Sequence, residues 1–105
     1  MRTCRALRVI SRKRLLEFAG RHTDAAEPLD NWYRRTKKAT WKNLTELRGD
    51  YRHADAVGIC TVFNIGGNKY RLITKIFYTA QIVLIRFVLT HTEYDKGRWK
   101  DDCSC

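Results

Sequence analysis

The sequence predicts an α+β domain in which an N-terminal strand and two helices pack on an antiparallel sheet, with a short C-terminal helix after the last strand. Three observations carry this prediction. The 105 residues are 44% hydrophobic and 11% aromatic, which suits one compact domain. Apolar residues recur at helical spacing in the first half, and β-branched and aromatic residues dominate after Gly58. We therefore expect helices first and a sheet second.

The first elements are a short strand and a helix. Residues 8–10 are Arg-Val-Ile, which we interpret as an edge strand. Ser11 is a candidate N-cap for the helix that follows, because a serine oxygen can accept from a free backbone N–H of the first turn. The expected apolar face of this helix consists of Leu15, Leu16, Phe18 and Ala19.

A second helix is expected to begin at Asp24. Glu27 follows three residues later as a capping-box partner, and Pro28 falls in the first turn, where a missing N–H is tolerated. The core-facing stripe of this helix is Leu29, Trp32 and Tyr33, at positions i, i+3 and i+4. A shorter helix is expected from Asn43, with Glu46 as its capping partner and with Trp41, Leu44 and Leu47 facing inward.

The second half predicts a three-stranded meander. Residues 59–65, 69–78 and 82–90 are rich in β-branched and aromatic side chains, and short polar segments separate them. The first separator is Gly66-Gly67-Asn68, whose residues tolerate positive φ. We therefore expect a tight hairpin between the first two of these strands.

The charge points to a polyanionic partner. Twenty-one basic and 11 acidic residues give a net charge of +10, and the pI is about 9.9. RNA is the leading candidate, ahead of an anionic membrane surface. The apolar run at residues 76–85 ends at Arg86, so it is too short to cross a bilayer, and no apolar leader follows the basic start. We expect a cytoplasmic protein that does not cross a membrane.

Four cysteines complete the composition. They are Cys4, Cys60, Cys103 and Cys105, and none forms the C-x-x-C pair typical of structural zinc. The C-x-C ending is too closely spaced for an ordinary disulfide framework. We expect reduced thiols, as in most cytoplasmic proteins, and neither a metal nor another cofactor.

Two arginines lie in strands within a segment that lacks carboxylates. Arg71 and Arg86 fall between residues 57 and 92, where the sequence has no Asp or Glu. Because an unpaired buried charge is very costly, both are expected on the solvated face of the sheet. The same face would bind phosphate if it is concave, because the planar guanidinium matches a phosphate group.

A compact set of acid-base groups follows the last strand. His91, Tyr94 and Asp95 lie within five residues, and in a helix His91 and Asp95 would be one turn apart. The alternative is that His91 caps the helix and Tyr94 only packs. Four nearby cations are candidates for RNA binding: Lys69, Lys75, Lys96 and Arg98.

Two segments resemble the HigB family of type II toxins, within the RelE-like superfamily. They are residues 62–73, which contain G-G-N-x-x-R, and residues 85–95, which contain T-H-x-E-Y-D. The likeness runs from about Arg8 to Lys100. It implies a RelE-like toxin domain at residues 8–100, with an N-terminal extension at 1–7 and a C-terminal tail at 101–105. Lys75 and that tail depart from the family pattern.

The resemblance implies a ribosome-dependent endoribonuclease that cuts mRNA in the ribosomal A site by metal-independent attack of the 2′-hydroxyl. It implies a HigA-like helix-turn-helix antitoxin as partner. Arg71 and Arg86 would hold the phosphate charge. His91 and Tyr94 would be the acid-base pair, oriented by Asp95.

Two rival classes of function remain. A noncatalytic basic RNA- or ribosome-binding module, as in a degenerate toxin, would explain the charge without the acid-base set. A metal-dependent nuclease using Glu93 and Asp95 is disfavoured, because such sites gather several oxygen ligands. His53, in an expected loop, matches no motif.

Overall fold

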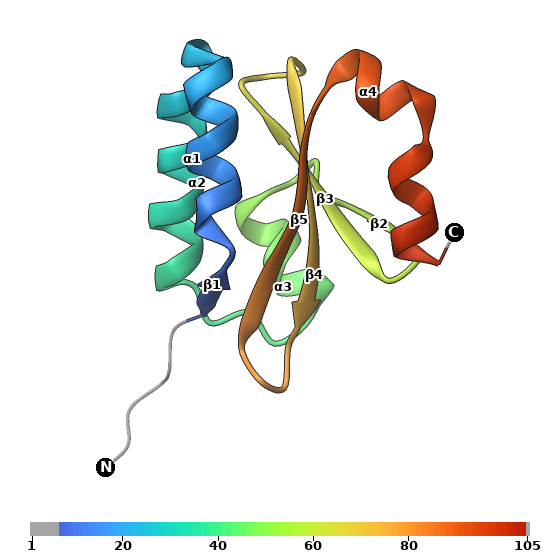
Figure 1. Ribbon diagram of the computed structural model, residues 1–105. Helices are drawn as coiled ribbons and strands as arrows, with labels where there is room; N and C mark the ends of the chain where they lie inside the picture. The colour runs from blue at the N-terminus through green and yellow to red at the C-terminus, as the bar shows by residue number, and fades with distance from the viewer. Residues whose placement is uncertain (1–6, 105) are drawn as a thin grey trace.

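The computed structural model describes residues 7–104, which form three layers (Figure 1). Helices α1 (Arg12–Arg21) and α2 (Ala26–Lys38) cover one face of the sheet. Helix α4 (His91–Lys96) and the 3₁₀ helix η2 (Arg98–Cys103) lie over the other face. The expected α+β class and the C-terminal helix are confirmed.

The sheet has five strands in the order β1-β5-β4-β3-β2. Strand β1 (Arg8–Ile10) is parallel to β5 (Ile82–Thr90) and forms one edge. Strands β5, β4 (Tyr70–Phe77), β3 (Cys60–Ile65) and β2 (Asp55–Val57) are antiparallel neighbours. The meander and the N-terminal strand are confirmed. The edge strand β2 was not predicted, because three residues are too few to show a period.

The helix starts agree less well with the sequence. Ser11 precedes α1 as expected, but its φ is 76° and its side chain makes no capping hydrogen bond. A 3₁₀ turn, η1 (Thr23–Ala25), precedes α2, so the capping box expected at Asp24 is wrong. The Asp24 carboxylate instead accepts hydrogen bonds from Lys69 and Tyr70.

The third helix begins as predicted. Asn43 caps α3 (Leu44–Asp50) by accepting a hydrogen bond from the N–H of Glu46 at 2.9 Å. The Glu46 side chain accepts from the N–H of Lys42 rather than from that of the cap residue. This helix packs Leu47 into the main core.

The two faces of the sheet bury separate apolar clusters. The face under α1 and α2 carries the main core, in which Leu15 and Phe18 are buried as expected, whereas Leu16 is exposed. A smaller cluster lies under η2. Its buried members are Cys60, Val62, Ile73, Trp99 and Cys103. The C-terminal turn is therefore anchored on the face that α1 and α2 leave uncovered.

A disulfide joins the C-terminal turn to the sheet. Cys103 of η2 is bonded to Cys60 of β3, 43 residues earlier in the sequence. The expectation of reduced thiols is wrong for this pair, because the fold brings two cysteines together that sequence spacing keeps apart. The other two cysteines, Cys4 and Cys105, lie outside the described residues.

The ends of the domain are well defined within residues 7–104. Most of the expected extension, residues 1–6, lies outside the described residues, whereas Leu7 is buried and donates its N–H to the carbonyl of Ala39. Residues 101–103 continue η2 rather than leaving the domain. No helix in this part of the chain is long and apolar enough to span a membrane.

Candidate active site

The hairpin between β3 and β4 positions Arg71. Gly66 and Gly67 adopt φ values of 62° and 70°, which residues with a side chain rarely do, so the expected tight turn is confirmed. Arg71 follows on β4, opposite Asn64 of β3. Its Nη1 donates to the carbonyl oxygens of Asn68 at 3.0 Å and Tyr70 at 3.2 Å. These bonds hold the guanidinium against the turn.

A capping box fixes the start of α4. The Thr90 hydroxyl accepts from the N–H of Glu93, and the Glu93 carboxylate accepts from the N–H of Thr90. The sequence carries the T-x-x-E pattern of this cap at residues 90–93. The alternative in which His91 caps the helix is therefore wrong, and Glu93 already has a structural role.

With α4 starting at His91, two predicted site residues meet. His91 Nδ1 lies 3.0 Å from Asp95 Oδ2, one helical turn later. Their side chains are 54% and 62% exposed, so substrate can reach both. Because a neutral imidazole has one donor and one acceptor nitrogen, an Nδ1–H that donates to Asp95 leaves Nε2 as the acceptor.

Tyr94 lies between a cation and a second aromatic ring. The Arg71 Cζ is 5.2 Å from the centroid of its ring, within the range of a cation–π interaction. The Trp99 ring stacks on Tyr94 at 4.9 Å with an interplanar angle of 15°, and Trp99 Nε1 donates to the Tyr94 carbonyl. The structure thus brings Arg71 of β4 onto Tyr94 of α4, the short helix that also carries the histidine–aspartate pair.

Arg86 has a different environment. The β4–β5 ladder shifts register between Ile73 and Thr74, so Arg86 is the extra residue of a bulge, and bulges re-aim side chains. Its Nε and Nη2 donate to the carboxylate of Asp102 at 2.7 and 3.0 Å. The hydrogen bond from Arg86 lowers the pKa of Asp102, and the nearby charges of Arg86 and Lys75 lower it further.

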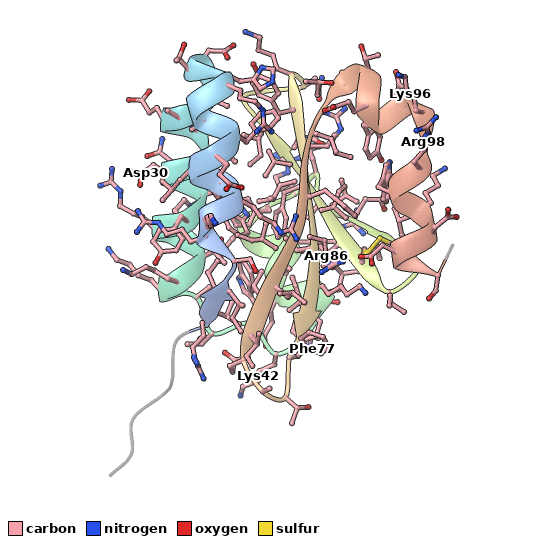
Figure 2. The ribbon with its side chains drawn as sticks, in the orientation of Figure 1. Asp30, Lys42, Phe77, Arg86, Lys96 and Arg98 are labelled. Atoms are coloured by element: carbon pink, nitrogen blue, oxygen red, sulfur yellow. A yellow bond between two sulfur atoms is a disulfide. The ribbon has the colours of Figure 1, made fainter. Side chains whose placement is uncertain are left out.

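Arg86 is separated from the other site residues along the sheet. Arg71 pairs with Leu89, three residues beyond Arg86, which corresponds to roughly 10 Å of strand. Figure 2 shows Arg86 midway along β5, whereas Lys96 and Arg98 are labelled where α4 ends and η2 begins. Sequence reasoning missed Asp102 because the tail was set aside as a departure from the family. The signal in the sequence was Arg86 itself. Because residues 57–92 contain no Asp or Glu, its carboxylate partner had to come from another segment.

The four predicted RNA-binding cations fall into two pairs. Lys69 forms an ion pair with Asp24, and Lys75 lies 3.5 Å from Asp102, so both already have acidic partners. Lys96 and Arg98 are exposed. They line a groove of about 340 Å³ whose other lining residues are Phe87, Leu89, Glu93 and Trp99. A groove with an apolar floor and cationic walls suits single-stranded nucleic acid.

His53 lies in a second hollow. It is exposed and lines a cavity of about 550 Å³ together with Asn64 and Asn68. The Asn68 carbonyl accepts from Arg71, so this cavity adjoins the candidate site. Within residues 7–104, no group of three or more His, Cys, Asp or Glu side chains is arranged to hold a metal ion.

The arrangement can perform acid-base chemistry on a phosphodiester. An imidazole and a phenol on one short helix can move protons, and the guanidinium beside the phenol can stabilise negative charge on phosphate. These groups belong to α4 and to the neighbouring strand β4, and α4 lies on the opposite side of the sheet from α1 and α2 (Figure 1).

Comparison with known proteins gives a family and several relatives. Residues 25–97 match the HigB toxin family, the RelE-like toxic component of a toxin-antitoxin system. An mRNA interferase toxin HigB of Escherichia coli (strain K12) is 50% identical over 34 residues, which is 32% of this chain and 33% of the relative. The mRNA interferases HigB of Escherichia coli O157:H7 and Shigella flexneri match to the same extent. The chain thus aligns with about a third of the length of these curated relatives.

Proposed function

Because the chain belongs to the HigB family of RelE-like toxic components of toxin-antitoxin systems, we propose that it is the toxin of a type II system, an endoribonuclease that cleaves mRNA without a metal ion and so inhibits translation. One observation carries the proposal above the others. The guanidinium of Arg71 lies over the ring of Tyr94, in the same helix as the His91–Asp95 pair. This supports a site in which a cation suited to phosphate lies beside a phenol, with an imidazole on the same short helix.

The reaction needs only groups that the chain supplies. The 2′-oxygen of ribose forms a bond to the adjacent phosphorus as the bond from phosphorus to the 5′-oxygen breaks. A base takes the proton of the 2′-hydroxyl, and an acid gives a proton to the leaving 5′-oxygen. The products are a 2′,3′-cyclic phosphate and a 5′-hydroxyl. Cations stabilise the crowded phosphate along this path.

We assign the roles as follows. The free Nε2 of His91 exchanges the proton, because Asp95 holds Nδ1. Tyr94 is its counterpart, and the guanidinium of Arg71 lies over its ring. Arg71 binds the scissile phosphate, and Arg86 contributes once its carboxylate partner moves away. Lys96 and Arg98 attract the flanking RNA strand.

The proposed partners follow from the family and the charge. A net charge of +10 favours binding to ribosomal RNA. We propose that the protein is cytoplasmic and that it cleaves mRNA in the ribosomal A site. We further propose that a HigA-like helix-turn-helix antitoxin neutralises the toxin.

One observation favours a second function, a noncatalytic RNA- or ribosome-binding module. The bidentate contact between Asp102 and Arg86 occupies one of the two arginines that the nuclease would need. In a degenerate toxin this contact could be permanent, because Arg86 would not need to bind a scissile phosphate. Such a protein would bind ribosomes, and substitutions at His91 and Tyr94 would change nothing.

The experiment that separates the two functions is induced expression of the wild type and of Arg71→Ala, His91→Ala and Tyr94→Ala, with Arg48→Ala as a matched surface control. Growth, protein level and mRNA 5′ ends are measured together. The nuclease predicts growth arrest and new mRNA ends for the wild type and the control only. Intact mRNA with a well-expressed, folded wild type would reject the nuclease.

Two further measurements test the finer points. Purified protein is incubated with mRNA alone and with ribosome-bound mRNA, each with and without a chelator. The proposal predicts cleavage of ribosome-bound mRNA that the chelator leaves unchanged. Cleavage of free mRNA at the same rate would reject ribosome dependence, and loss of activity with the chelator would reject the metal-independent mechanism.

A further inference from the structure

The carboxylate of Asp102 binds Arg86 with the same two-bond geometry that a phosphate group adopts on an arginine. Two nearly parallel hydrogen bonds, at 2.7 and 3.0 Å, join the two side chains, and the Nζ of Lys75 lies 3.5 Å from the same carboxylate. All three side chains are only about a quarter exposed, between 22% and 29%. Because this bidentate geometry is also the one used for phosphate, the carboxylate lies where an RNA phosphate would bind.

The residue after Asp102 is covalently attached to the sheet. Cys103 is fully buried, bonded to Cys60, and its carbonyl accepts from the N–H of Ile59 at 2.9 Å. Figure 2 shows this sulfur–sulfur bond between the sheet and the C-terminal turn. The disulfide therefore keeps the carboxylate of its neighbour next to Arg86.

The disulfide is the covalent anchor of this last turn. Trp99 anchors the start of η2 by stacking on Tyr94, but the end of η2 relies on Cys103. A 3₁₀ helix has poor hydrogen-bond geometry and is seldom stable over more than a few residues. Apart from the disulfide, the end of η2 is held by the hydrogen bond from Ile59 and by the contacts of Asp102, and an RNA phosphate would compete for the same Arg86 donors.

We propose that the Cys60–Cys103 disulfide is a redox latch that keeps Asp102 on Arg86 and so blocks a phosphate-binding position. In the latched state Arg86 and Lys75 are occupied by the chain's own carboxylate. This proposal rests on the proposed function, because it assigns regulation to the same RNA-binding face.

The release step is a thiol–disulfide exchange with a dithiol. One thiolate of the dithiol attacks a sulfur of the Cys60–Cys103 bond, and the second thiol then closes the dithiol into a disulfide. Two electrons and two protons pass to the protein, which gains two thiols. The last turn of η2 separates from the sheet, Asp102 leaves, and phosphate can reach Arg86. In a reducing cytoplasm the toxin is open.

The first test measures binding without cleavage. A fluorescent 2′-deoxy oligonucleotide, which lacks the attacking hydroxyl, is titrated with oxidised protein and with protein reduced by dithiothreitol, and mass spectrometry after alkylation counts free thiols. Reduction should tighten binding about tenfold, since Arg86 gains a charge-assisted contact. Oxidised Asp102→Asn should bind as tightly as the reduced wild type.

Matched variants control for charge and reagent. Asp101→Asn makes the same charge change one residue earlier on an exposed side chain, and it should bind like the oxidised wild type. The double variant Cys60→Ala/Cys103→Ala should bind the oligonucleotide as tightly as the reduced wild type, and dithiothreitol should not change its affinity. If circular dichroism shows that this variant is unfolded, the comparison between the oxidised wild type and oxidised Asp102→Asn still tests whether Asp102 blocks binding.

Three results would overturn the latch. Binding could be the same before and after complete reduction, the dithiol could fail to reduce the folded protein, or Asp102→Asn could bind more weakly because Asp102 positions Arg86. Cleavage of ribosome-bound mRNA by the same samples distinguishes failure of the latch from failure of the proposed nuclease function. Equal cleavage in both redox states rejects the latch and keeps the nuclease. Redox-dependent binding without any cleavage keeps the latch and rejects the nuclease.

Discussion

Arg71 and Tyr94 approach each other from different elements, β4 and α4, with the guanidinium carbon 5.2 Å from the ring centroid. Carbonyl oxygens of the preceding turn and an aromatic ring hold Arg71, whereas a carboxylate holds Arg86. An aromatic ring does not neutralise a guanidinium. Arg71 therefore keeps its full charge for the phosphate that we propose it binds, even when the C-terminal turn is in place.

Replacing Arg71 tests this assignment. We expect Arg71→Ala to lower the single-turnover rate of cleavage about 100-fold or more, as loss of a group that stabilises transition-state charge does. Arg71→Lys should retain an intermediate rate, because the charge remains but the planar contacts are lost. The rate is measured on ribosome-bound mRNA, and equal rates for the lysine variant and the wild type would contradict the requirement for a planar group.

Asp95 is expected to affect the rate of cleavage and not the stability of the fold. Asp95→Asn removes the carboxylate that orients His91, so the cleavage rate should fall while circular dichroism stays unchanged. The pair is more than half exposed, and exposed pairs contribute at most about 1 kcal/mol to the free energy of unfolding. Urea titration provides the stability measurement. A large loss of stability with an unchanged cleavage rate would make the pair structural.

The buried hydroxyl of Thr74 stabilises the sheet where the β4–β5 register shifts. It is fully buried and donates to the carbonyl of Thr61 at 2.9 Å. Thr74→Val keeps the shape but removes the donor, so the free energy of unfolding should fall by about 1–2 kcal/mol. Thr45→Val, on the exposed surface of α3, should change it by less than about 0.5 kcal/mol. Urea unfolding of both variants measures the difference.

Asp24 predicts how stability depends on pH. Hydrogen bonds from Lys69 and Tyr70 hold the pKa of its carboxyl below the usual 3.8. Between that lowered pKa and the usual one, the folded state binds fewer protons than the unfolded state, so stability rises with pH. The contribution is complete above the usual pKa and is lost as the pH falls through the lowered one.

The measurement is the urea midpoint from about pH 5 down to about pH 2. The wild type should lose more stability over this range than Asp24→Asn, which has no carboxylate to protonate. Glu27→Gln, an exposed change just after the same turn, controls for the removal of one negative charge. Parallel curves for the wild type and Asp24→Asn would show that the ion pair with Lys69 does not stabilise the fold.

The sequence predicted the elements that have a clear period. Strand β5 was predicted to the residue, and the meander, the turn at Gly66-Gly67 and the His91–Asp95 contact follow from local patterns of two to ten residues. Local rules failed where a distant partner competes for the same group. Asp24 was expected to cap a helix, but Lys69 lies close in space and takes its carboxylate.

The same reasoning explains what was missed in the site. Asp102 and Cys103 reach their partners only because α4 and η2 fold back over the sheet, and no spacing along the chain encodes that return. The predicted set therefore contained the groups that local motifs mark, such as His91 and Tyr94. It lacked the carboxylate that determines whether Arg86 is available.

The covalent bond between Cys60 and Cys103 also alters how the protein responds to pulling. The two residues are 43 positions apart, so the bond closes a loop that contains β4, β5 and α4. A degradation machine that grips the C-terminal end of the oxidised chain would pull directly on β3, next to the sheet edge, and would have to thread two strands of polypeptide at once. The reduced chain would instead unravel singly from α4 and β5. The oxidised toxin should therefore outlast its reduced form under such a machine.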